Sequence, residues 1–293
     1  MLVATAPSLA AQEIAVMDVG DALAMPRPEP DRLIRYGPQP QQFGELRLPV
    51  GPGPHPVAVV VHGGCWLAEY DLGYMSALSA QLAAEGVATW NVEYRRVGDA
   101  GGGWPGTFHD VGAAADALRR LARDHDLDIN RVVVLGHSAG GHLALWLAGR
   151  HRLPADDPLR GQQPLAPSGV VSLAGIPDLA GYASPEGCGA AVPRLLGGIM
   201  AEGSSRLRRT SPIAMVPLES PQVLVIGQND PIVPRDQADR YLAAAVKSGD
   251  RIRLEEIPGA GHFELVNPAS AAWPTVSAAV RDLLESAVDL QRR

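Results

Sequence analysis

Apolar runs alternate with amphipathic segments along most of the chain, from about residue 43 onward. Val57 to Val61 is a continuous β-branched run, which is typical of a strand buried on both faces of a sheet. Residues 107–125 instead carry apolar side chains at helical spacing, on one stripe. The pattern predicts strands at 42–50, 57–61, 87–94, 131–135, 169–174, 222–226 and 251–257, and helices at 71–86, 107–125, 138–150, 236–248 and 270–287.

Strands that alternate with helices of this length predict the α/β class, with a mostly parallel central sheet flanked by helices. The alternation is interrupted at residues 177–217, which we expect to form a short cap over one edge of the sheet. Residues 20–42 are rich in Pro, Gln and Arg, so we expect an extended N-terminal arm at 1–42 and a single domain at 43–293.

Composition and charge exclude several classes of protein. The 46% hydrophobic content fills a sizeable core, and no apolar run reaches the roughly 18 residues of a membrane span. A net charge of −7 argues against nucleic acid as a partner. Residues 1–12 are compatible with the tail of a secretory signal, but no basic residue precedes Arg27. We therefore expect a cytoplasmic protein, with secretion or a periplasmic location as the alternative.

The pentapeptide Gly136-His137-Ser138-Ala139-Gly140 matches G-x-S-x-G. It follows an expected strand and opens an expected helix, which is the setting of a nucleophile elbow. In such a turn the serine takes a strained backbone conformation, and flanking glycines let neighbouring backbone pass. We expect Ser138 to be a nucleophile, and we give its neighbour His137 a weak role in substrate binding.

A serine nucleophile needs a base, and the base needs an acid that fixes its tautomer. His262 lies on a glycine-flanked loop after the last expected strand, and Asp230 follows the strand at 222–226. The order Ser138, Asp230, His262 is one of the known orders of a Ser-His-Asp triad. Asp236 is the alternative acid, although it is expected to start a helix.

The segment His62-Gly63-Gly64-Cys65-Trp66 follows the strand at 57–61. Two glycines allow backbone N–H groups to face a nucleophile at the same sheet edge. We assign the oxyanion hole to the N–H groups of Gly64, Cys65 and Ala139. Trp66 either lines the pocket or packs the loop. Cys65 and Cys188 are the two cysteines, and whether they form a disulfide stays open.

G-H-S-A-G-G, H-G-G-x-W, the G-x-x-D-x-x-V-P segment and the G-x-G-H loop together resemble the α/β-hydrolase superfamily, over residues 43–289. The H-G-G-x-W segment is most similar to the esterase and arylformamidase group, which includes kynurenine formamidases and feruloyl-esterase-like proteins. The resemblance implies the same triad and oxyanion donors. Cys65 stands where that group commonly has Tyr or Gly.

These residues predict a serine hydrolase that cleaves a small acyl or aryl carboxylic ester through an acyl-enzyme, with no metal and no cofactor. Hydrolysis of an aryl formamide such as formylkynurenine is the alternative within enzymes, because its mechanism is identical. A ligand-binding receptor on a hydrolase fold is the alternative from another class. We expect a small-molecule ester or amide as the partner, and a homodimer stays open.

Overall fold

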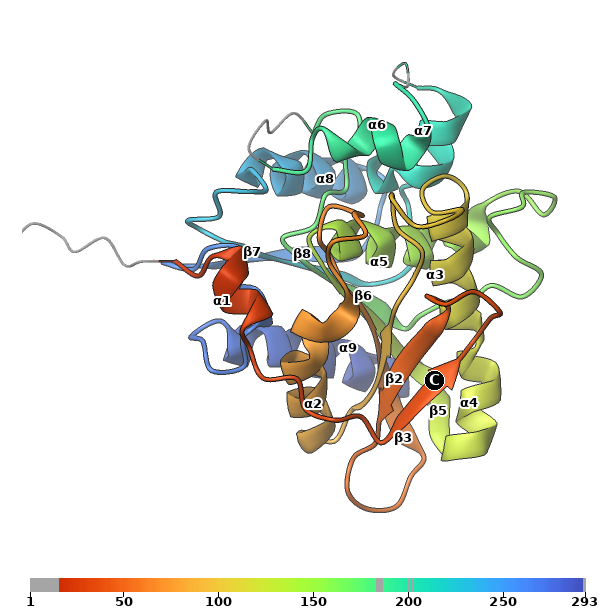
Figure 1. Cartoon of the computed structure of the whole chain (residues 1–293), viewed down its shortest axis with the longest axis vertical. Helices are drawn as coiled ribbons and strands as arrows, with labels where there is room; N and C mark the ends of the chain where they lie inside the picture. The colour runs from red at the N-terminus through yellow and green to blue at the C-terminus, as the bar shows by residue number, and fades with distance from the viewer. Residues whose placement is uncertain (1–15, 183–186, 200, 202, 292–293) are drawn as a thin grey trace, which may run out of the picture.

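The computed structural model describes residues 16–182, 187–199, 201 and 203–291. Within them the strands form one sheet of eight, in the order β1-β2-β4-β3-β5-β6-β7-β8 (Figure 1). β1 and β2 pair antiparallel, β2 pairs antiparallel with β4, and the remaining pairs are parallel. The strands are β1 (Arg32–Arg35), β2 (Phe43–Arg47), β3 (His55–Val61), β4 (Ala88–Val92), β5 (Leu127–His137), β6 (Gly169–Leu173), β7 (Gln222–Gly227) and β8 (Ile252–Ile257).

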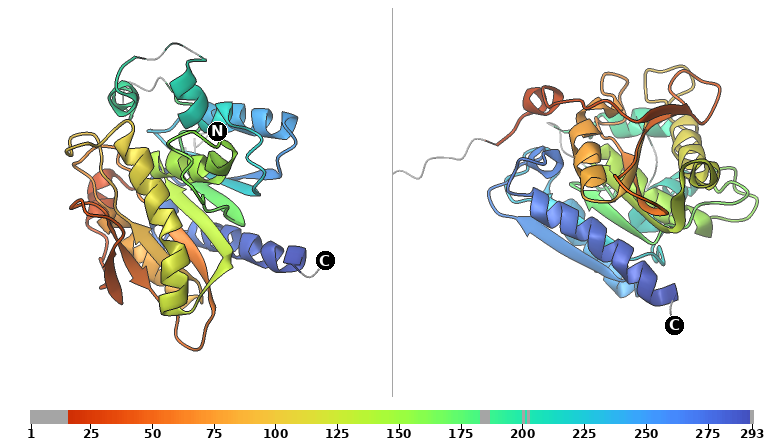
Figure 2. Two further views of the ribbon diagram at one scale, coloured as in Figure 1. Left: turned by 90° about the vertical axis from the view of Figure 1, so that its right-hand side faces the viewer. Right: turned by 90° about the horizontal axis from the view of Figure 1, so that it is seen from below.

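Helices cover both faces of this sheet, as the sequence pattern predicts. The larger helices are α2 (Ser76–Ala84), α3 (Gly106–Asp116), α4 (Leu118–His125), α5 (Ala139–Gly149), α8 (Arg235–Lys247) and α9 (Trp273–Gln291). Val59 of β3 packs in a core with α3, α4, α5 and α8, while its neighbour Val60 packs on the other face with α2 and α9. Figure 2 shows α9 on the opposite side of the sheet from α3 and α4. Alternate residues of a buried strand therefore fill two separate cores.

The N-terminal part of the chain differs from the expected arm. Residues 32–35 form β1, which pairs with β2 in register from Arg32↔Leu46 to Arg35↔Phe43, so the sheet begins before residue 43. A short helix, α1 (Val19–Leu23), precedes it and is held by a capping box between Asp18 and Asp21. Such short elements lack the repeated apolar spacing by which longer ones are recognised. Residues 1–12 lie outside the described residues.

The interruption at residues 177–217 contains two short helices, α6 (Ala191–Leu196) and α7 (Ser205–Thr210). Figure 1 shows them together at one end of the molecule, near α8 and α5. A single turn, η1 (Leu72–Met75), precedes α2. No helix among the described residues is both long and apolar enough to cross a membrane.

The chain order of the strands creates a switch point between β3 and β5. β4 pairs with one edge of β3, and β5 returns to pair with the other edge. In open α/β sheets such a point leaves a crevice beyond the carboxyl ends of the strands, where ligands bind. The loop after β3 and the turn after β5 meet there.

Candidate active site

Ser138 occupies a sharp turn between β5 and α5. Its backbone angles are φ 56° and ψ −121°, a strained combination for a residue with a side chain. Its N–H donates to Leu173 O at 2.8 Å, which anchors the turn to β6. A Cβ added to Gly136 would lie 2.1 Å from Gly140 O, and one added to Gly140 would lie 2.1 Å from Val61 O. Glycine at both positions therefore allows the turn to form.

Asp230 and His262 are hydrogen-bonded to each other at the ends of β7 and β8. His262 Nδ1 donates to Asp230 Oδ2 at 2.7 Å, and both side chains are at least 95% buried. The other oxygen, Asp230 Oδ1, accepts the N–H groups of Ile232 (2.8 Å) and Val233 (3.0 Å). The carboxylate is thus fixed in place, and it holds the proton of His262 on Nδ1.

The alternative acid, Asp236, lies elsewhere. It is in the first turn of α8, its side chain is 58% exposed, and it pairs with Arg240 one helical turn later. An exposed i,i+4 ion pair is a common surface feature. The geometry therefore favours Asp230 over Asp236 as the partner of His262.

Ser138 and His262 line the same cavity. Its volume is about 270 Å³, near the lower end for small-molecule sites. Gly64 and Gly187 also line this cavity, through their backbone atoms. The other lining residues are Val19, Ala22, Leu23, Cys65, Tyr70, Tyr74, His137, Ile232 and Phe263. No Asp, Glu, Lys or Arg belongs to this lining, so its character is apolar.

The loop after β3 passes beside Ser138 in an unusual conformation. Gly64, Cys65 and Trp66 all have positive φ, of 92°, 53° and 57°. In the part of the chain that the structure describes, the N–H groups of Gly64 and Cys65 donate to no protein atom. Ala139 is the first residue of α5, where an N–H has no partner inside the helix. All three N–H groups are therefore free to bind an anion.

Trp66 lies in the core and not in the cavity. Its ring is fully buried, and Trp66 Nε1 donates to His142 Nδ1 at 3.2 Å. His142 Nε2 in turn donates to Thr210 O at 2.8 Å, which links the loop to the end of α7. Of the two roles considered for Trp66, pocket lining is wrong and packing of the loop is right.

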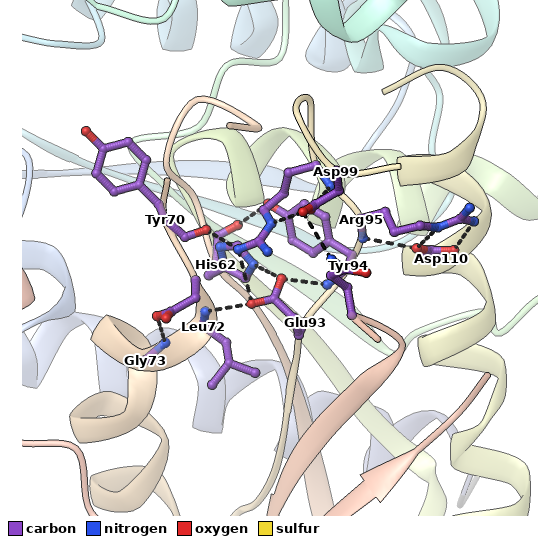
Figure 3. A network of polar contacts seen from close by, with 12 residues as sticks. His62, Tyr70, Leu72, Gly73, Glu93, Tyr94, Arg95, Asp99 and Asp110 are labelled. Carbon is purple, nitrogen blue, oxygen red and sulfur yellow. Dashed lines mark hydrogen bonds and ion pairs between the residues drawn. The ribbon is translucent and has the colours of Figure 1, made fainter. Parts of the chain in front are cut away.

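A buried carboxylate holds the loop after β3 from below (Figure 3). Glu93, just after β4, accepts His62 Nε2 at 2.9 Å and the N–H groups of Leu72 (3.2 Å) and Tyr94 (2.8 Å). Arg96 pairs with the same carboxylate at 3.3 Å. With the His62 ring, the Arg96 guanidinium and two backbone N–H groups as partners, the carboxylate is well satisfied despite its burial.

A disulfide also restrains the loop after β3, by joining it to the segment before α6. Cys65 and Cys188 are joined across 123 residues, with 5.0 Å between their Cα atoms. Cys188 lies shortly before α6, so the bond fastens the loop after β3 to the cap segment. The pairing that the sequence left open is present.

His137 and Tyr74 have contacts that the sequence pattern did not reveal. Tyr74 Oη lies 3.0 Å from His137 Nδ1, and His137 Nε2 lies 3.1 Å from His262 O. Both ring nitrogens of His137 are thus occupied by protein atoms, which leaves none for a polar group of a substrate. Tyr74 stands in an otherwise apolar stretch, Leu72-Gly73-Tyr74-Met75, that carries no motif. Only its tertiary position singles it out.

The described residues contain no cluster of three or more His, Cys, Asp or Glu side chains that could hold a metal ion. His142, which the sequence places five residues after His137, bonds to Trp66 and Thr210 instead. Burial lowers the pKa of His142 to about 4, so the ring is neutral at pH 7.

Comparison with known proteins agrees with this architecture. A model of the BD-FAE family matches residues 47–244. Esterase LipC of Mycobacterium tuberculosis is 31% identical over 266 residues, which are 84% of this chain and 63% of LipC. Esterase LipQ of the same organism is 27% identical over 236 residues, which are 78% of this chain and 55% of LipQ. The chain thus spans a little over half of these relatives' length.

Solved structures share the fold at low sequence identity. A truncated carbohydrate esterase from gut microbiota superposes with a TM-score of 0.76 at 19% identity, covering 86% of this chain and 95% of that one. Esterase B from Lactobacillus rhamnosis superposes with a TM-score of 0.76 at 20% identity, covering 92% of this chain and 90% of that one. These neighbours confirm the α/β-hydrolase fold that the motifs predict. Because the family model matches more than half of this chain, the chain belongs to the BD-FAE family.

Proposed function

We propose that this protein is a serine hydrolase that cleaves a small, neutral acyl or aryl carboxylic ester through an acyl-enzyme intermediate. The observation that carries the proposal is the Asp230–His262 hydrogen bond of 2.7 Å, in a site whose cavity also exposes the strained Ser138. The names of the relatives LipC and LipQ, both called esterases, support it.

In the proposed mechanism His262 acts through Nε2, because Asp230 holds the proton on Nδ1. Nε2 takes the proton of Ser138 Oγ as the hydroxyl attacks the ester carbonyl. The imidazolium then protonates the leaving alcohol or phenol, which departs and leaves an acyl-serine. Water, deprotonated by the same nitrogen, attacks the acyl-serine and releases the acid.

The tetrahedral intermediates carry an oxyanion that needs donors. We assign this role to the N–H groups of Gly64, Cys65 and Ala139, of which the first two belong to the cavity lining. This assignment is supported by the N–H groups of Gly64 and Cys65, which have no protein acceptor among the described residues. The N–H of Ala139 also lies at the N-terminus of α5, where the helix dipole stabilises a negative charge.

The cavity suggests the kind of ester. Its wall is apolar at Val19, Leu23, Ile232 and Phe263, and no permanently charged side chain belongs to it. An anionic or cationic substrate would be desolvated there without a partner, which is unfavourable. A neutral ester with a small apolar acyl or aryl group fits this chemistry. No observation favours the arylformamidase or receptor alternatives.

The disulfide bears on the compartment. Disulfides persist in oxidising surroundings and are rare where cytosolic thiols are kept reduced. Because Cys65 is bonded to Cys188, we propose that the protein works in an oxidising compartment rather than in the cytoplasm that the sequence favoured. Formation of a homodimer stays a prediction that gel filtration with light scattering can test.

The direct test combines turnover with active-site labelling. We expect the purified chain to hydrolyse p-nitrophenyl acetate and butyrate, and to be labelled by a fluorophosphonate at Ser138, as read by peptide mass spectrometry. Ser138→Ala should abolish labelling and lower kcat by about 10⁴ or more. Formylkynurenine belongs in the same substrate panel, as the arylformamidase alternative.

Ser277→Ala is a matched control. Ser277 lies near the start of α9 and is also buried, but it bonds to Glu85 at the end of α2, and neither residue lines the cavity. This variant should keep both labelling and turnover. Wild-type protein that is neither labelled nor active on any substrate of the panel would overturn the proposed function.

A further inference from the structure

Three buried hydrogen bonds in series connect the loop after β3 to the loop after β8. Gly63 N–H donates to Tyr74 Oη at 2.5 Å. Tyr74 Oη lies 3.0 Å from His137 Nδ1, and His137 Nε2 lies 3.1 Å from the carbonyl oxygen of His262. Tyr74 comes from η1 and His137 from the end of β5, so four separate segments meet in this series.

The donor and the acceptor of each hydrogen bond can be assigned by starting from the carbonyl of His262. A carbonyl oxygen only accepts, so His137 Nε2 carries a proton and donates to His262 O. Burial, with His262 close by, lowers the pKa of His137 well below its usual value, so the ring is neutral and Nδ1 accepts. Burial also raises the pKa of the Tyr74 phenol, which therefore stays protonated and donates to Nδ1. The N–H of Gly63 then has the phenol oxygen as its acceptor.

The two ends of the series lie in the two halves of the proposed active site. Gly63 directly precedes the proposed oxyanion donors Gly64 and Cys65. It also packs on the elbow, since a Cβ at Gly63 would lie 2.9 Å from Ser138 Cβ and 2.5 Å from His137 O. The other end is the backbone of His262 itself, whose ring lies 4.5 Å from that of His137.

The series supplies a restraint that the Asp230 contact does not. Asp230 fixes the side chain of His262 through Nδ1, whereas His137 fixes the backbone of the loop that carries it. Other bonds hold the flanks of this loop: Asn229 N–H donates to Ala260 O at 2.8 Å, and Gly261 N–H donates to Glu264 Oε2 at 2.9 Å. The bond from His137 acts at the carbonyl of His262 itself. Because transfer of a proton to Nε2 depends on sub-ångström geometry, the backbone restraint matters for rate.

We propose that Tyr74 and His137 are positioning residues, which set the loop of the oxyanion donors and the base His262 at a fixed separation around Ser138. This inference rests on the proposed function. Neither residue exchanges a proton with the substrate: their role is exerted through Gly63 and through the carbonyl of His262.

Removing the phenol oxygen breaks two of the three bonds. Tyr74→Phe leaves Gly63 N–H and His137 Nδ1 buried without partners, while the ring still fills its place in the cavity wall. Against the best p-nitrophenyl ester, we expect kcat to fall about 10- to 100-fold and KM to change less than about 3-fold. The low-field proton resonance of the Asp230–His262 hydrogen bond should shift or broaden.

Tyr241→Phe is the matched control. Tyr241 is a fully buried tyrosine of α8 whose hydroxyl donates to Gln222 Oε1 at 2.6 Å, and neither residue belongs to the cavity lining. The variant loses one buried phenol hydrogen bond where Tyr74→Phe loses two, so its melting temperature should also fall, by a smaller amount. Its kcat and its low-field resonance should match those of the wild type.

Substitutions at His137 test the series from its other side. In His137→Gln the side-chain amide nitrogen takes the place of Nε2 and can still donate to His262 O. In His137→Asn the amide oxygen takes the place of Nδ1 and cannot reach that carbonyl. We expect the Gln variant to keep more kcat than the Asn variant, and the Tyr74→Phe/His137→Asn double variant to lose much less than the product of the single losses.

The outcomes separate the inference from the proposed function. Wild-type turnover and labelling of Ser138 test the function. If the wild type is active and Tyr74→Phe retains full kcat, or if the Asn and Gln variants are equally active, the positioning role is overturned. Should Tyr74→Phe not fold, the comparison of His137→Gln with His137→Asn decides the matter alone.

Discussion

The sulfur atoms of Cys65 and Cys188 are bonded to each other, so the loop after β3 is covalently tied to the segment before α6 across 123 residues. The same loop is held below by the Glu93 carboxylate. Two independent restraints thus act on a loop whose three consecutive residues, Gly64, Cys65 and Trp66, have positive φ. A loop in such a conformation needs restraints of this kind, because each non-glycine residue there is strained.

Loss of the disulfide should reduce stability more than activity. A closed loop of 123 residues restricts the unfolded chain strongly, so the Cys65→Ala/Cys188→Ala variant should lose about 2 to 5 kcal/mol of unfolding free energy. Its kcat at 25 °C should fall less than about 10-fold, because alanine keeps the backbone N–H proposed as a donor. Urea unfolding and steady-state kinetics measure both. Two free thiols in the denatured, unreduced wild type would contradict the disulfide.

Substitution of the two candidate acids should give opposite results. Asp230→Asn removes the charge that stabilises the imidazolium and allows the wrong tautomer of His262, so kcat should fall about 10⁴-fold. Asp236→Asn removes only an exposed pair with Arg240 and should change kcat less than about 2-fold. Progress curves with a p-nitrophenyl ester measure both variants. A larger loss in the Asp236 variant would refute the proposed role of Asp230.

The N-terminal helix α1 should influence which esters are accepted. Leu23 and Val19 contribute to the cavity wall, and the segment is fastened to the loop after β8 through Met17 N–H, which donates to Glu264 Oε1 at 2.5 Å. Leu23→Ala should raise KM for p-nitrophenyl butyrate by about 3- to 10-fold, through lost apolar contact, while longer acyl chains should gain relative to butyrate.

Leu33→Ala is the control for the helix α1. Leu33 is 63% exposed on β1 and is not part of the catalytic cavity wall. Its substitution should leave the chain-length profile unchanged. An unchanged profile in Leu23→Ala as well would mean that α1 does not contact the acyl group.

Stability should depend on pH through His142. Burial lowers the pKa of this histidine to about 4 in the folded protein, whereas it is about 6.5 in an unfolded chain. Between pH 6.5 and 4, His142 is therefore protonated in the unfolded chain and neutral in the folded protein. The unfolding free energy contributed by His142 is complete above pH 6.5 and declines by up to about 3 kcal/mol as pH falls toward 4.

The variant His142→Gln isolates this contribution. Its amide can still donate to Thr210 O in place of Nε2, but it does not titrate. Urea unfolding at pH 7.5, 6 and 5 should show a smaller decline in the variant than in the wild type. His137, whose pKa burial also lowers, should leave a residual decline in the same direction. Equal declines in the two proteins would show that His142 is not the residue responsible.

Local sequence pattern predicted seven of the eight strands that the structure describes, and it selected the candidate catalytic residues of the site. The continuous apolar run of β3 is visible because the strand is buried on both faces of the sheet. The apolar stripe Val111, Ala115, Leu118 and Leu121 is visible because α3 and α4 bury one helical face. Ser138, Asp230 and His262 could be selected because each follows such a strand, and parallel strands bring their carboxyl ends to one edge.

Tertiary structure alone decided the contacts made by residues that are distant in sequence. β1 joins the sheet, Trp66 turns into the core, Cys65 bonds to Cys188, and α1 borders the cavity. The series from Gly63 through Tyr74 and His137 to the backbone of His262 is of the same kind. Such contacts depend on how whole elements pack, and a short segment carries no periodic signal of the partner that the fold will bring to it.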